Sequence, residues 1–320
     1  MTDQRPTEVN DAAPSALSHL IGQRGVVDQV TVALEAAAAD RRKFDHALLV
    51  GGPGLGKSQV AKVVAAEMGT GLHEVLGQSV TGPADLNALL LGAKDRDLIH
   101  IDECHELDKE YQTALYLALD QRKVVLPSRA KGGPQSIPLN DFSLLLSTTD
   151  EYGLLQPLRD RMRLVLRFQF YTVGELAALV AQRGRALGWP VHDGLPPLIA
   201  ERARGTPRLA LRLLQACRRV CRAEGETTIT RGHLTRACAL EGLDEIGLGP
   251  TERQYLAALA EGASRLNVVA SLIGLPARTV SQVIEPFLIR SGLILKDDQG
   301  RRQLTAEGRE LLTRRANGPE

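Results

Sequence analysis

Aromatic side chains are scarce in this sequence: Phe, Tyr and Trp together make up 3% of its 320 residues. A core with so few rings must be built from Leu, Val, Ile and Ala, which favours helix-rich packing. Charge of one sign is lacking too, because the formal net charge is only +1. The chain therefore has no overall field to hold DNA or an anionic membrane, and a nucleic-acid contact must come from a local patch.

Long apolar runs are also missing. No stretch of about 18 apolar residues occurs, so we expect no membrane-spanning segment and no membrane partner. Residues 1–15 are polar and lack the apolar centre of a signal peptide. We therefore expect a disordered tail at 1–15 and a cytoplasmic protein.

Cysteine is limited to four residues, three of which gather near one histidine in the sequence. Cys217 and Cys221 lie one helical turn apart, and His233 and Cys238 follow. A zinc site can be written from this set, but the spacing is not that of a zinc knuckle. Buried structural thiols are the preferred interpretation.

What the sequence does contain is an alternation of short apolar strands and helical patterns up to about residue 172. Residues 46–50 form an apolar strand that leads into a glycine-rich loop at 51–56 and a helix at 59–68. A second strand at 97–101 ends in Asp102-Glu103, and a third spans 142–146. This alternation predicts an α/β domain with a parallel, helix-covered sheet.

From Val173 the alternation stops and only helical patterns follow, until a linker at 247–250. Beyond the linker, three helices and a hairpin predict a winged-helix domain. At 320 residues the chain is long enough for two or three domains. The expected division is a tail at 1–15, an ATPase domain at 16–172, a helical lid at 173–246, a winged helix at 247–314 and a tail at 315–320.

The loop between the first strand and its helix has the Walker A pattern Gly51-x4-Gly56-Lys57-Ser58, with a further glycine at Gly54. Backbone N–H groups of such a loop cradle phosphates, the lysine reaches the β- and γ-oxygens, and the serine hydroxyl ligates Mg²⁺. A chance glycine turn is the weaker alternative, because strand and helix flank the loop as this site requires. ATP and Mg²⁺ are the predicted ligands.

Polar residues at the ends of the next two strands complete this chemistry. Asp102 should hold the hydrated metal with Ser58, and Glu103 should polarise the attacking water. Thr149 can orient the water or sense the γ-phosphate, although ordinary strand-end threonines remain an alternative. Arg161 follows in a polar stretch, and a guanidinium there suits the charge on a transferring phosphoryl group, although most arginines are simply solvated.

At this point the sequence resembles the RuvB-type AAA+ ATPases, the Holliday-junction branch-migration motors. The resemblance covers about residues 22–312, in the family's order and nearly its spacing. It rests on Asp45-His46 before the loop, Glu67-Met68-Gly69, Ile101-Asp-Glu-Cys-His105, Pro157-Leu-Arg-Asp-Arg161, Phe170-Tyr171, Ala203-Arg-Gly-Thr-Pro-Arg208 and Val283-Ile-Glu-Pro-Phe-Leu288.

The resemblance implies roles that the residues alone do not give. Arg161 looks like a finger that acts on a neighbouring subunit's ATP, and Arg208 like a sensor arginine that touches the γ-phosphate. Tyr171 looks like a nucleotide-pocket residue, and Lys296 and Arg301 fall where family arginines contact DNA. The family also implies a homo-oligomeric ring, a hexamer, that acts on duplex or branched DNA, with a junction-binding partner protein docking on the hairpin at 124–139.

The sequence also departs from the family pattern. The family's Leu-Arg-Pro segment at the adenine end of the nucleotide reads Ala12-Ala13-Pro14 here, and its Phe-Gly after the finger reads Met162-Arg163. One wing arginine is replaced by Gln299, beside Asp297-Asp298. These departures are compatible with a diverged relative as well as with the housekeeping motor.

Two functions follow from these observations. The first is an ATP-driven ring motor that translocates DNA in recombination and repair. The second is an assembly or remodelling ATPase of the same fold that acts on a protein partner, as clamp loaders do, with the winged helix as a docking module.

Overall fold

The computed structural model describes residues 8–126 and 135–316, which divide into two compact units. The first unit contains residues 1–189 and 205–212, and the second contains residues 190–204 and 213–320. Contacts within the chain separate these two units and do not divide it further, so the three-domain division expected from the sequence remains a prediction. No helix in the described ranges is long and apolar enough to cross a membrane.

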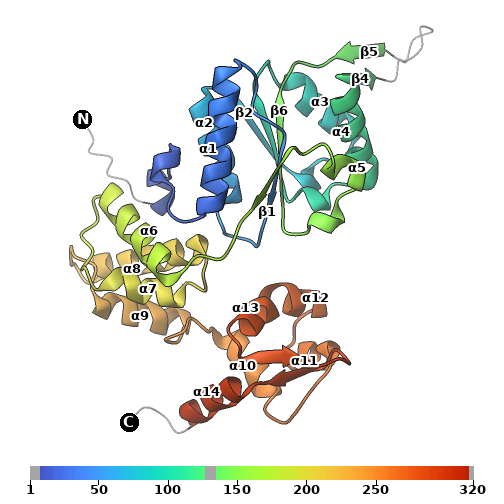
Figure 1. The fold of residues 1–320 in the computed structure, drawn as a ribbon. Coiled ribbons are helices and arrows are strands. Elements are labelled where there is room, and N and C mark those ends of the chain that lie inside the picture. Colours follow the sequence, from blue (N-terminus) through green and yellow to red (C-terminus); the bar gives the residue numbers. More distant parts are fainter. Residues whose placement is uncertain (1–7, 127–134, 317–320) are drawn as a thin grey trace. The chain divides into compact units, whose positions relative to one another are not determined.

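The first unit is built on a five-stranded parallel sheet with the order β2-β3-β6-β1-β7 (Figure 1). The strands are β1 (Ala47–Val50), β2 (Leu72–Leu76), β3 (Leu98–Asp102), β6 (Ser143–Thr148) and β7 (Leu164–Arg167). The predicted parallel sheet is therefore confirmed. Because parallel strands all end at one edge, the loops after β1, β3 and β6 meet there.

Helices cover both faces of this sheet, as a parallel sheet requires. On one face, α1 (Arg24–Ala39) and α2 (Lys57–Met68) pack on Leu49, Leu98 and Leu145. On the other, α3 (Pro83–Gly92) and α4 (Lys109–Gln121) pack on Ile99, Ile101 and Leu146. The alternation of strand side chains between two apolar layers explains why these strands appear as continuous apolar runs.

One buried polar chain interrupts the apolar face beneath α2. His100 on β3 lies within hydrogen-bonding distance of Ser147 on β6 (Nε2–Oγ, 2.8 Å) and of Glu74 on β2 (Nδ1–Oε1, 3.2 Å). Burial lowers the pKa of His100, so the ring is neutral near pH 7. Since Ser147 is fully buried, this acid–histidine–serine order ties three strands together and has no access to a substrate.

The sequence did not predict several elements of the first unit. β2 and β7 are short and contain polar residues, so they do not appear in the sequence as the apolar runs that predict buried strands. Helices α3 and α5 (Gln156–Arg159) and the assignment of α6 (Val173–Ala186) to this unit also come from the structure. The hairpin predicted at 124–139 is present as β4 (Lys123–Leu126) and β5 (Gln135–Pro138), and its connecting residues 127–134 lie outside the described ranges.

The second unit is helical apart from one hairpin. Its helices include α7 (Leu195–Arg202), α9 (Arg231–Glu241), α10 (Pro250–Ala258) and α11 (Leu266–Leu272), and α8 (Pro207–Ala223) continues into it from residue 213. The four cysteines of the chain are all buried and reduced, three of them in this unit, as predicted for structural thiols.

The winged-helix pattern is confirmed within the second unit. The third of the three predicted helices appears as α12 (Ala277–Thr279), a π-helical turn at Val280–Ile284 and α13 (Glu285–Arg290). Pro286 has no N–H to donate, which explains why the regular ladder is interrupted just before it. The hairpin β8 (Ile294–Lys296) and β9 (Arg302–Leu304) follows, and a further helix, α14 (Ala306–Ala316), was not predicted.

Candidate functional site

The phosphate loop connects β1 to α2 and is shaped by glycines that cannot be replaced without strain. Gly54 and Gly56 have φ values of +77° and +98°. A Cβ on Gly54 would lie 2.9 Å from Cβ of Arg208, and a Cβ on Gly51 would lie 2.7 Å from Cβ of Phe168. The loop therefore has both the left-handed backbone and the close packing that require glycine.

Lys57 occupies the concave side of this loop. Its Nζ donates hydrogen bonds to the carbonyl oxygens of Gly51 (2.7 Å) and Gly52 (3.1 Å), and the side chain is buried. Burial lowers the pKa of Lys57, while the carboxylates of Glu103 and Asp102 oppose the shift. A buried ammonium that is hydrogen-bonded to loop carbonyls is suited to receive the negative charge of a triphosphate.

The two predicted metal ligands lie side by side. The Ser58 hydroxyl, at the start of α2, donates to Oδ2 of Asp102, at the end of β3, over 2.9 Å. A hydroxyl and a carboxylate are the hard oxygen donors that Mg²⁺ prefers, so the residues present fit this ion. These two side chains would supply part of the oxygen shell of the ion, and phosphate oxygens of a nucleotide and water molecules would complete it.

Glu103 is held in a strained conformation beside this pair. Its φ is +47°, a left-handed value that is uncommon for a non-glycine residue, and its N–H donates to Oδ1 of Asp102 (3.0 Å). Thr149 follows β6 directly, and its hydroxyl donates to Oε2 of Glu103 over 3.3 Å. The structure thus brings Asp102, Glu103 and Thr149 to one edge of the sheet, with strain of the kind that gathers at functional sites.

His105 is a neighbour of this group that the sequence analysis missed as a site residue. Its Nδ1 lies 3.5 Å from Oε2 of Glu103 and 3.1 Å from the hydroxyl of buried Thr148. The Asp-Glu-Cys-His run was the available signal, because the short helical turn at Cys104–Glu106 follows the strand and brings His105 beside Glu103.

Tyr171 and Arg208 approach the loop from the end of the sheet and from the start of α8. The Tyr171 hydroxyl donates to the carbonyl of Leu55 (3.4 Å), and burial raises the pKa of Tyr171 to about 12. The backbone N–H of Arg208 donates to the carbonyl of Gly54 (3.4 Å). Both predicted cofactor-binding residues therefore contact the phosphate loop, although their sequence positions are far from it.

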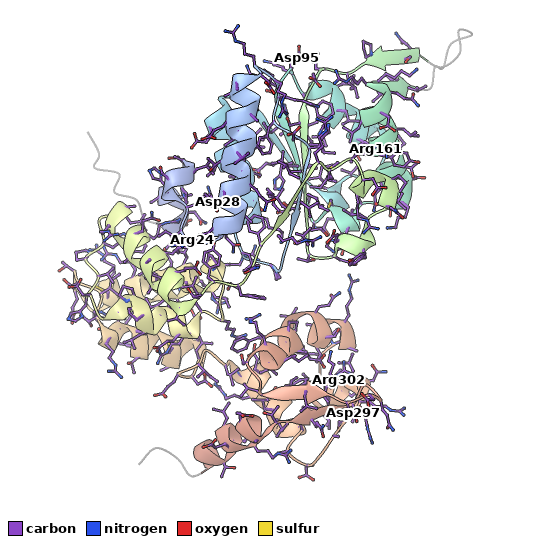
Figure 2. All side chains as sticks on the ribbon, viewed as in Figure 1. Arg24, Asp28, Asp95, Arg161, Asp297 and Arg302 are labelled. Atoms are coloured by element: carbon purple, nitrogen blue, oxygen red, sulfur yellow. The ribbon has the colours of Figure 1, made fainter. Side chains whose placement is uncertain are left out.

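Arg161 lies away from this group, beside α4 and α5 (Figure 2). Its guanidinium forms a bidentate ion pair with Asp120 on α4, with Nε 2.6 Å from Oδ1, and also donates to the carbonyl of Pro157 on α5. One face of the guanidinium covers the ring of Tyr116 at 4.9 Å. All these partners belong to the α4–α5 side, so Arg161 takes no part in the phosphate-loop contacts of its own subunit described above.

The two predicted DNA-binding cations of the wing are both engaged in ion pairs. Nζ of Lys296 lies 2.8 Å from Oε2 of Glu285, whose side chain is fully buried and also accepts bonds from Arg302 and Tyr255. Arg301 pairs with Asp297 at 3.0 Å, within the turn between β8 and β9. Asp297 and Arg302 are visible at this edge of the hairpin in Figure 2. The wing therefore compensates much of its own positive charge.

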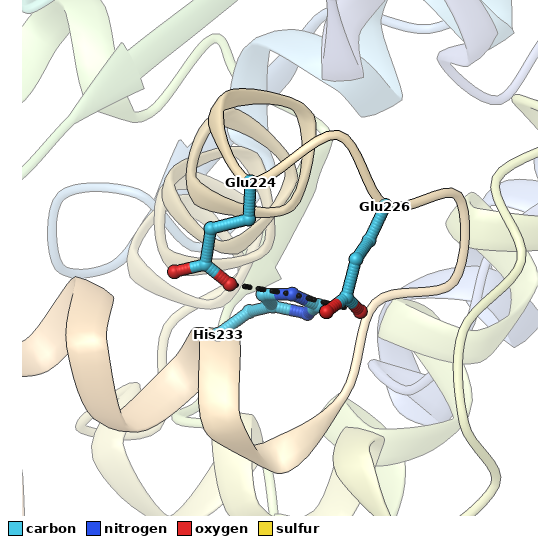
Figure 3. A group of neighbouring side chains, drawn as sticks. All are labelled: Glu224, Glu226 and His233. Atoms are coloured by element: carbon cyan, nitrogen blue, oxygen red, sulfur yellow. Dashed lines mark ion pairs between the residues drawn. The ribbon is translucent and has the colours of Figure 1, made fainter.

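A histidine and two carboxylates lie together in the second unit. Nε2 of His233 lies 3.1 Å from Glu224 and 3.3 Å from Glu226 (Figure 3). Nδ1 of the same ring accepts the N–H of Thr230 (2.9 Å). The group therefore links the segment that follows α8 to the start of α9.

Comparison with known proteins gives one family over almost the whole chain. Three domain models match in order: the Holliday junction DNA helicase RuvB P-loop domain over residues 12–168, the RuvB AAA lid domain over 171–244 and the RuvB C-terminal winged helix domain over 245–313.

Individual relatives agree with these matches. The chain is 34% identical to the Holliday junction branch migration complex subunit RuvB of Kosmotoga olearia over 95% of this chain and 91% of that protein. It is 35% identical to the subunit of the same name from Anaeromyxobacter dehalogenans, over 96% and 92%. The solved Thermotoga maritima RuvB Holliday junction branch migration motor superposes with a TM-score of 0.83 at 30% identity, over 94% of this chain and 98% of that chain. By sequence, by domain order and by fold, the chain belongs to the RuvB family of AAA+ ATPases.

Proposed function

We propose that this chain is the subunit of an ATP-driven, ring-forming motor that moves branched DNA in recombination and repair. One observation carries the proposal: the phosphate loop, the Ser58–Asp102 pair and the Glu103–Thr149 pair meet at one edge of the parallel sheet. The relatives named as Holliday junction branch migration complex subunits supply the substrate class.

The residues divide the work of ATP hydrolysis among them. The loop N–H groups and Lys57 bind the phosphates, and Ser58 with Asp102 holds Mg²⁺, which when bound neutralises charge on the phosphate oxygens. Glu103 orients and polarises the attacking water, and the Thr149 hydroxyl keeps the Glu103 carboxylate in position. Arg208 and Tyr171 complete the pocket from the α8 side and from the end of the sheet.

Arg161 supplies its positive charge to the ATP of an adjacent subunit, so that hydrolysis requires a ring. Its position just after α5, where its side chain contacts α4 and not the phosphate loop of its own chain, supports this role. We propose a homo-oligomeric ring, a hexamer, located in the cytoplasm. The β4–β5 hairpin, where Val125 is 54% exposed, is the proposed docking site for a junction-binding protein.

The test is a branch-migration assay on a synthetic four-way junction with ATP and Mg²⁺. Wild-type protein, with its docking partner where one is found, should separate the junction into two duplexes. Glu103→Gln protein should bind ATP and the junction but leave the junction intact. A wild-type protein that hydrolyses ATP and never changes the junction would refute the DNA-motor function.

A remodelling ATPase acting on a protein partner is the second candidate, and the wing favours it. Lys296 and Arg301 are both paired with carboxylates, which leaves fewer cations for DNA phosphates. Binding of duplex DNA at low salt distinguishes the two functions, because a docking module for proteins would not retain DNA under any salt condition.

A further inference from the structure

His105 is a largely buried side chain beside the candidate site that the mechanism proposed above does not use. It belongs to the short helical turn Cys104–Glu106 that follows β3, and its side chain is 17% exposed. A Cβ added to Gly153 would lie only 3.1 Å from Cβ of His105. The turn is therefore packed closely against the segment that follows β6, which fixes the position from which the imidazole ring extends.

Nδ1 of this ring faces two oxygen atoms. Oγ1 of Thr148 lies 3.1 Å away, and Oε2 of Glu103 lies 3.5 Å away. The Thr148 hydroxyl donates to the carbonyl of Asp150 over 2.9 Å, so its lone pairs remain available to the ring. A lone pair on Nδ1 would face a carboxylate, whereas an N–H at this position satisfies both oxygens. We therefore assign a proton to Nδ1.

The two contacts that hold the Glu103 carboxylate both fall on the same oxygen. Oε2 accepts the Thr149 hydroxyl over 3.3 Å and faces Nδ1 of His105. Within residues 8–126 and 135–316, no hydrogen bond or ion pair reaches Oε1 of Glu103. Because the side chain is 37% exposed, Oε1 is open to a water molecule. One oxygen is thus anchored, and the other is available to polarise water.

The left-handed backbone of Glu103 does not by itself fix this orientation. Several rotatable bonds separate the backbone from the carboxylate, and a glutamate side chain loses considerable entropy when it is held in one conformation. Thr149 holds it from the end of β6, and His105 approaches it from the turn after β3. Nε2 of His105 lies 3.4 Å from Oε1 of Glu106, which orients the ring from its other side.

We propose that His105 is a positioning residue for Glu103: its Nδ1–H, together with the Thr149 hydroxyl, holds Oε2, so that Oε1 receives the attacking water. The inference rests on the proposed function, because it requires that Glu103 polarises this water. The separation of 3.5 Å is longer than a hydrogen bond. Contacts of this kind in a nucleotide-free site tighten when the substrate is bound.

Substitutions that place an amide N–H at one end of the ring or at the other test this inference. His105→Asn puts an N–H near the position of Nδ1, His105→Gln puts one near Nε2, and His105→Ala removes both. All three variants should bind ATP with wild-type affinity. The kcat of His105→Ala and His105→Gln should fall about tenfold, part of the roughly 10²- to 10⁴-fold that a positioned base supplies, whereas His105→Asn should retain most of the rate.

A second measurement determines whether His105 acts through Glu103. In Glu103→Gln protein, whose residual rate is measured in a single turnover, adding His105→Ala should cause no further loss, because the carboxylate that it positions is gone. His192→Ala, which changes an exposed histidine of the second unit, is the control and should hydrolyse ATP as wild type does. Urea melts compare the folds, and the Asn and Gln variants keep the inference testable if the alanine variant folds poorly.

Three results would overturn the inference. A wild-type kcat for His105→Ala would remove any role, and equal losses in the Asn and Gln variants would show that the ring only fills space. A further loss in the Glu103→Gln background would show that His105 acts on another group. If Glu103→Gln itself turns over ATP at the wild-type rate, the role proposed for Glu103 is wrong and that of His105 falls with it, whereas a wild-type rate confined to His105→Ala leaves the proposed function intact.

Discussion

Lys57 and Glu103 lie close together but act on different parts of the nucleotide, and substitution should separate their effects. Lys57→Ala removes the buried ammonium that faces the loop carbonyls, so nucleotide binding should be lost. Glu103→Gln keeps the contact to Thr149 but not the negative charge, so ATP should bind and turn over very slowly. Equilibrium nucleotide binding and steady-state phosphate release measure the two effects. Wild-type turnover by Glu103→Gln would show that another group positions the water.

Arg161 should act on a neighbour's nucleotide, and mixing variants measures this. Arg161→Ala subunits alone should bind ATP and not hydrolyse it, with a loss of about 10³ to 10⁵ in rate. Mixed with Lys57→Ala subunits, which keep Arg161, they should recover activity in rings shown by mass to contain both. Mixed rings without recovery would mean that Arg161 works within its own chain or not at all.

The position of a single site residue could be predicted where the residue belongs to a short sequence motif. Gly51 to Ser58 and Asp102-Glu103 follow strands directly, so their place at the sheet edge follows from topology. The partner of Arg161 was not predictable, because Asp120 is 41 residues away and reaches it only through the packing of α4 against α5. The internal pairing of Lys296 was hidden for the same reason, since Glu285 lies on a different element.

Among the elements, the β8–β9 hairpin depends on a buried carboxylate that two cations satisfy. Glu285 on α13 is fully buried and bonded to Arg302, Lys296 and Tyr255. Glu285→Gln would leave both cations without their charge partner and should lower the free energy of unfolding by about 2 kcal/mol at pH 7. Urea melts of the two proteins at pH 7 measure the difference, and identical midpoints would contradict the expectation.

The effect of this substitution should depend on pH, and its direction follows from the pKa. Burial alone would raise the pKa of Glu285, but the bonds from Arg302, Lys296 and Tyr255 outweigh burial and lower it. A carboxylate with a lowered folded pKa stabilises the fold above its unfolded pKa of about 4.3 and loses that contribution as pH falls through the folded value. The gap between wild type and Glu285→Gln should therefore be full at pH 6 and shrink below about pH 4. A gap that is unchanged at pH 3 would exclude this charge effect.

At the level of elements, periodicity predicted most helices and the three central strands. It failed at β2 and β7, where Glu74 and Arg167 break the apolar run because ion pairs and edge positions tolerate charge there. Periodicity also did not predict the π-helical turn at Val280–Ile284, because such a turn changes the spacing of the apolar residues very little. Such details depend on hydrogen-bond geometry, which the pattern of residue types does not encode.

For the whole molecule, DNA affinity should depend on assembly. Each phosphate neutralised adds roughly 0.9 to the slope of log affinity against log salt. With Lys296 and Arg301 partly compensated by Glu285 and Asp297, one wing should bind duplex weakly, with a slope of about 1 to 2 and no base preference. Rings formed with ATP should bind far more tightly, because several wings act on one duplex.

A salt titration of duplex binding by the full-length protein, with and without ATP, measures this difference. Lys296→Ala combined with Arg301→Ala should weaken binding by the rings equally at every sequence. Equal affinity with and without assembly would contradict the dependence on several wings, and a melt of the double variant controls for loss of the wing fold.

The distance between Arg161 and the phosphate loop of its own chain also has a genetic meaning. If every working site is shared by two copies, an Arg161 variant silences the site of its neighbour, while its own phosphate loop still works next to an intact copy. A defective allele would then place inactive sites in rings that also contain intact subunits, provided that its product still enters the ring. Co-expression of Arg161 or Lys57 variants with the intact gene should accordingly yield rings with mixed sites, whereas variants that cannot assemble should leave rings of intact subunits alone.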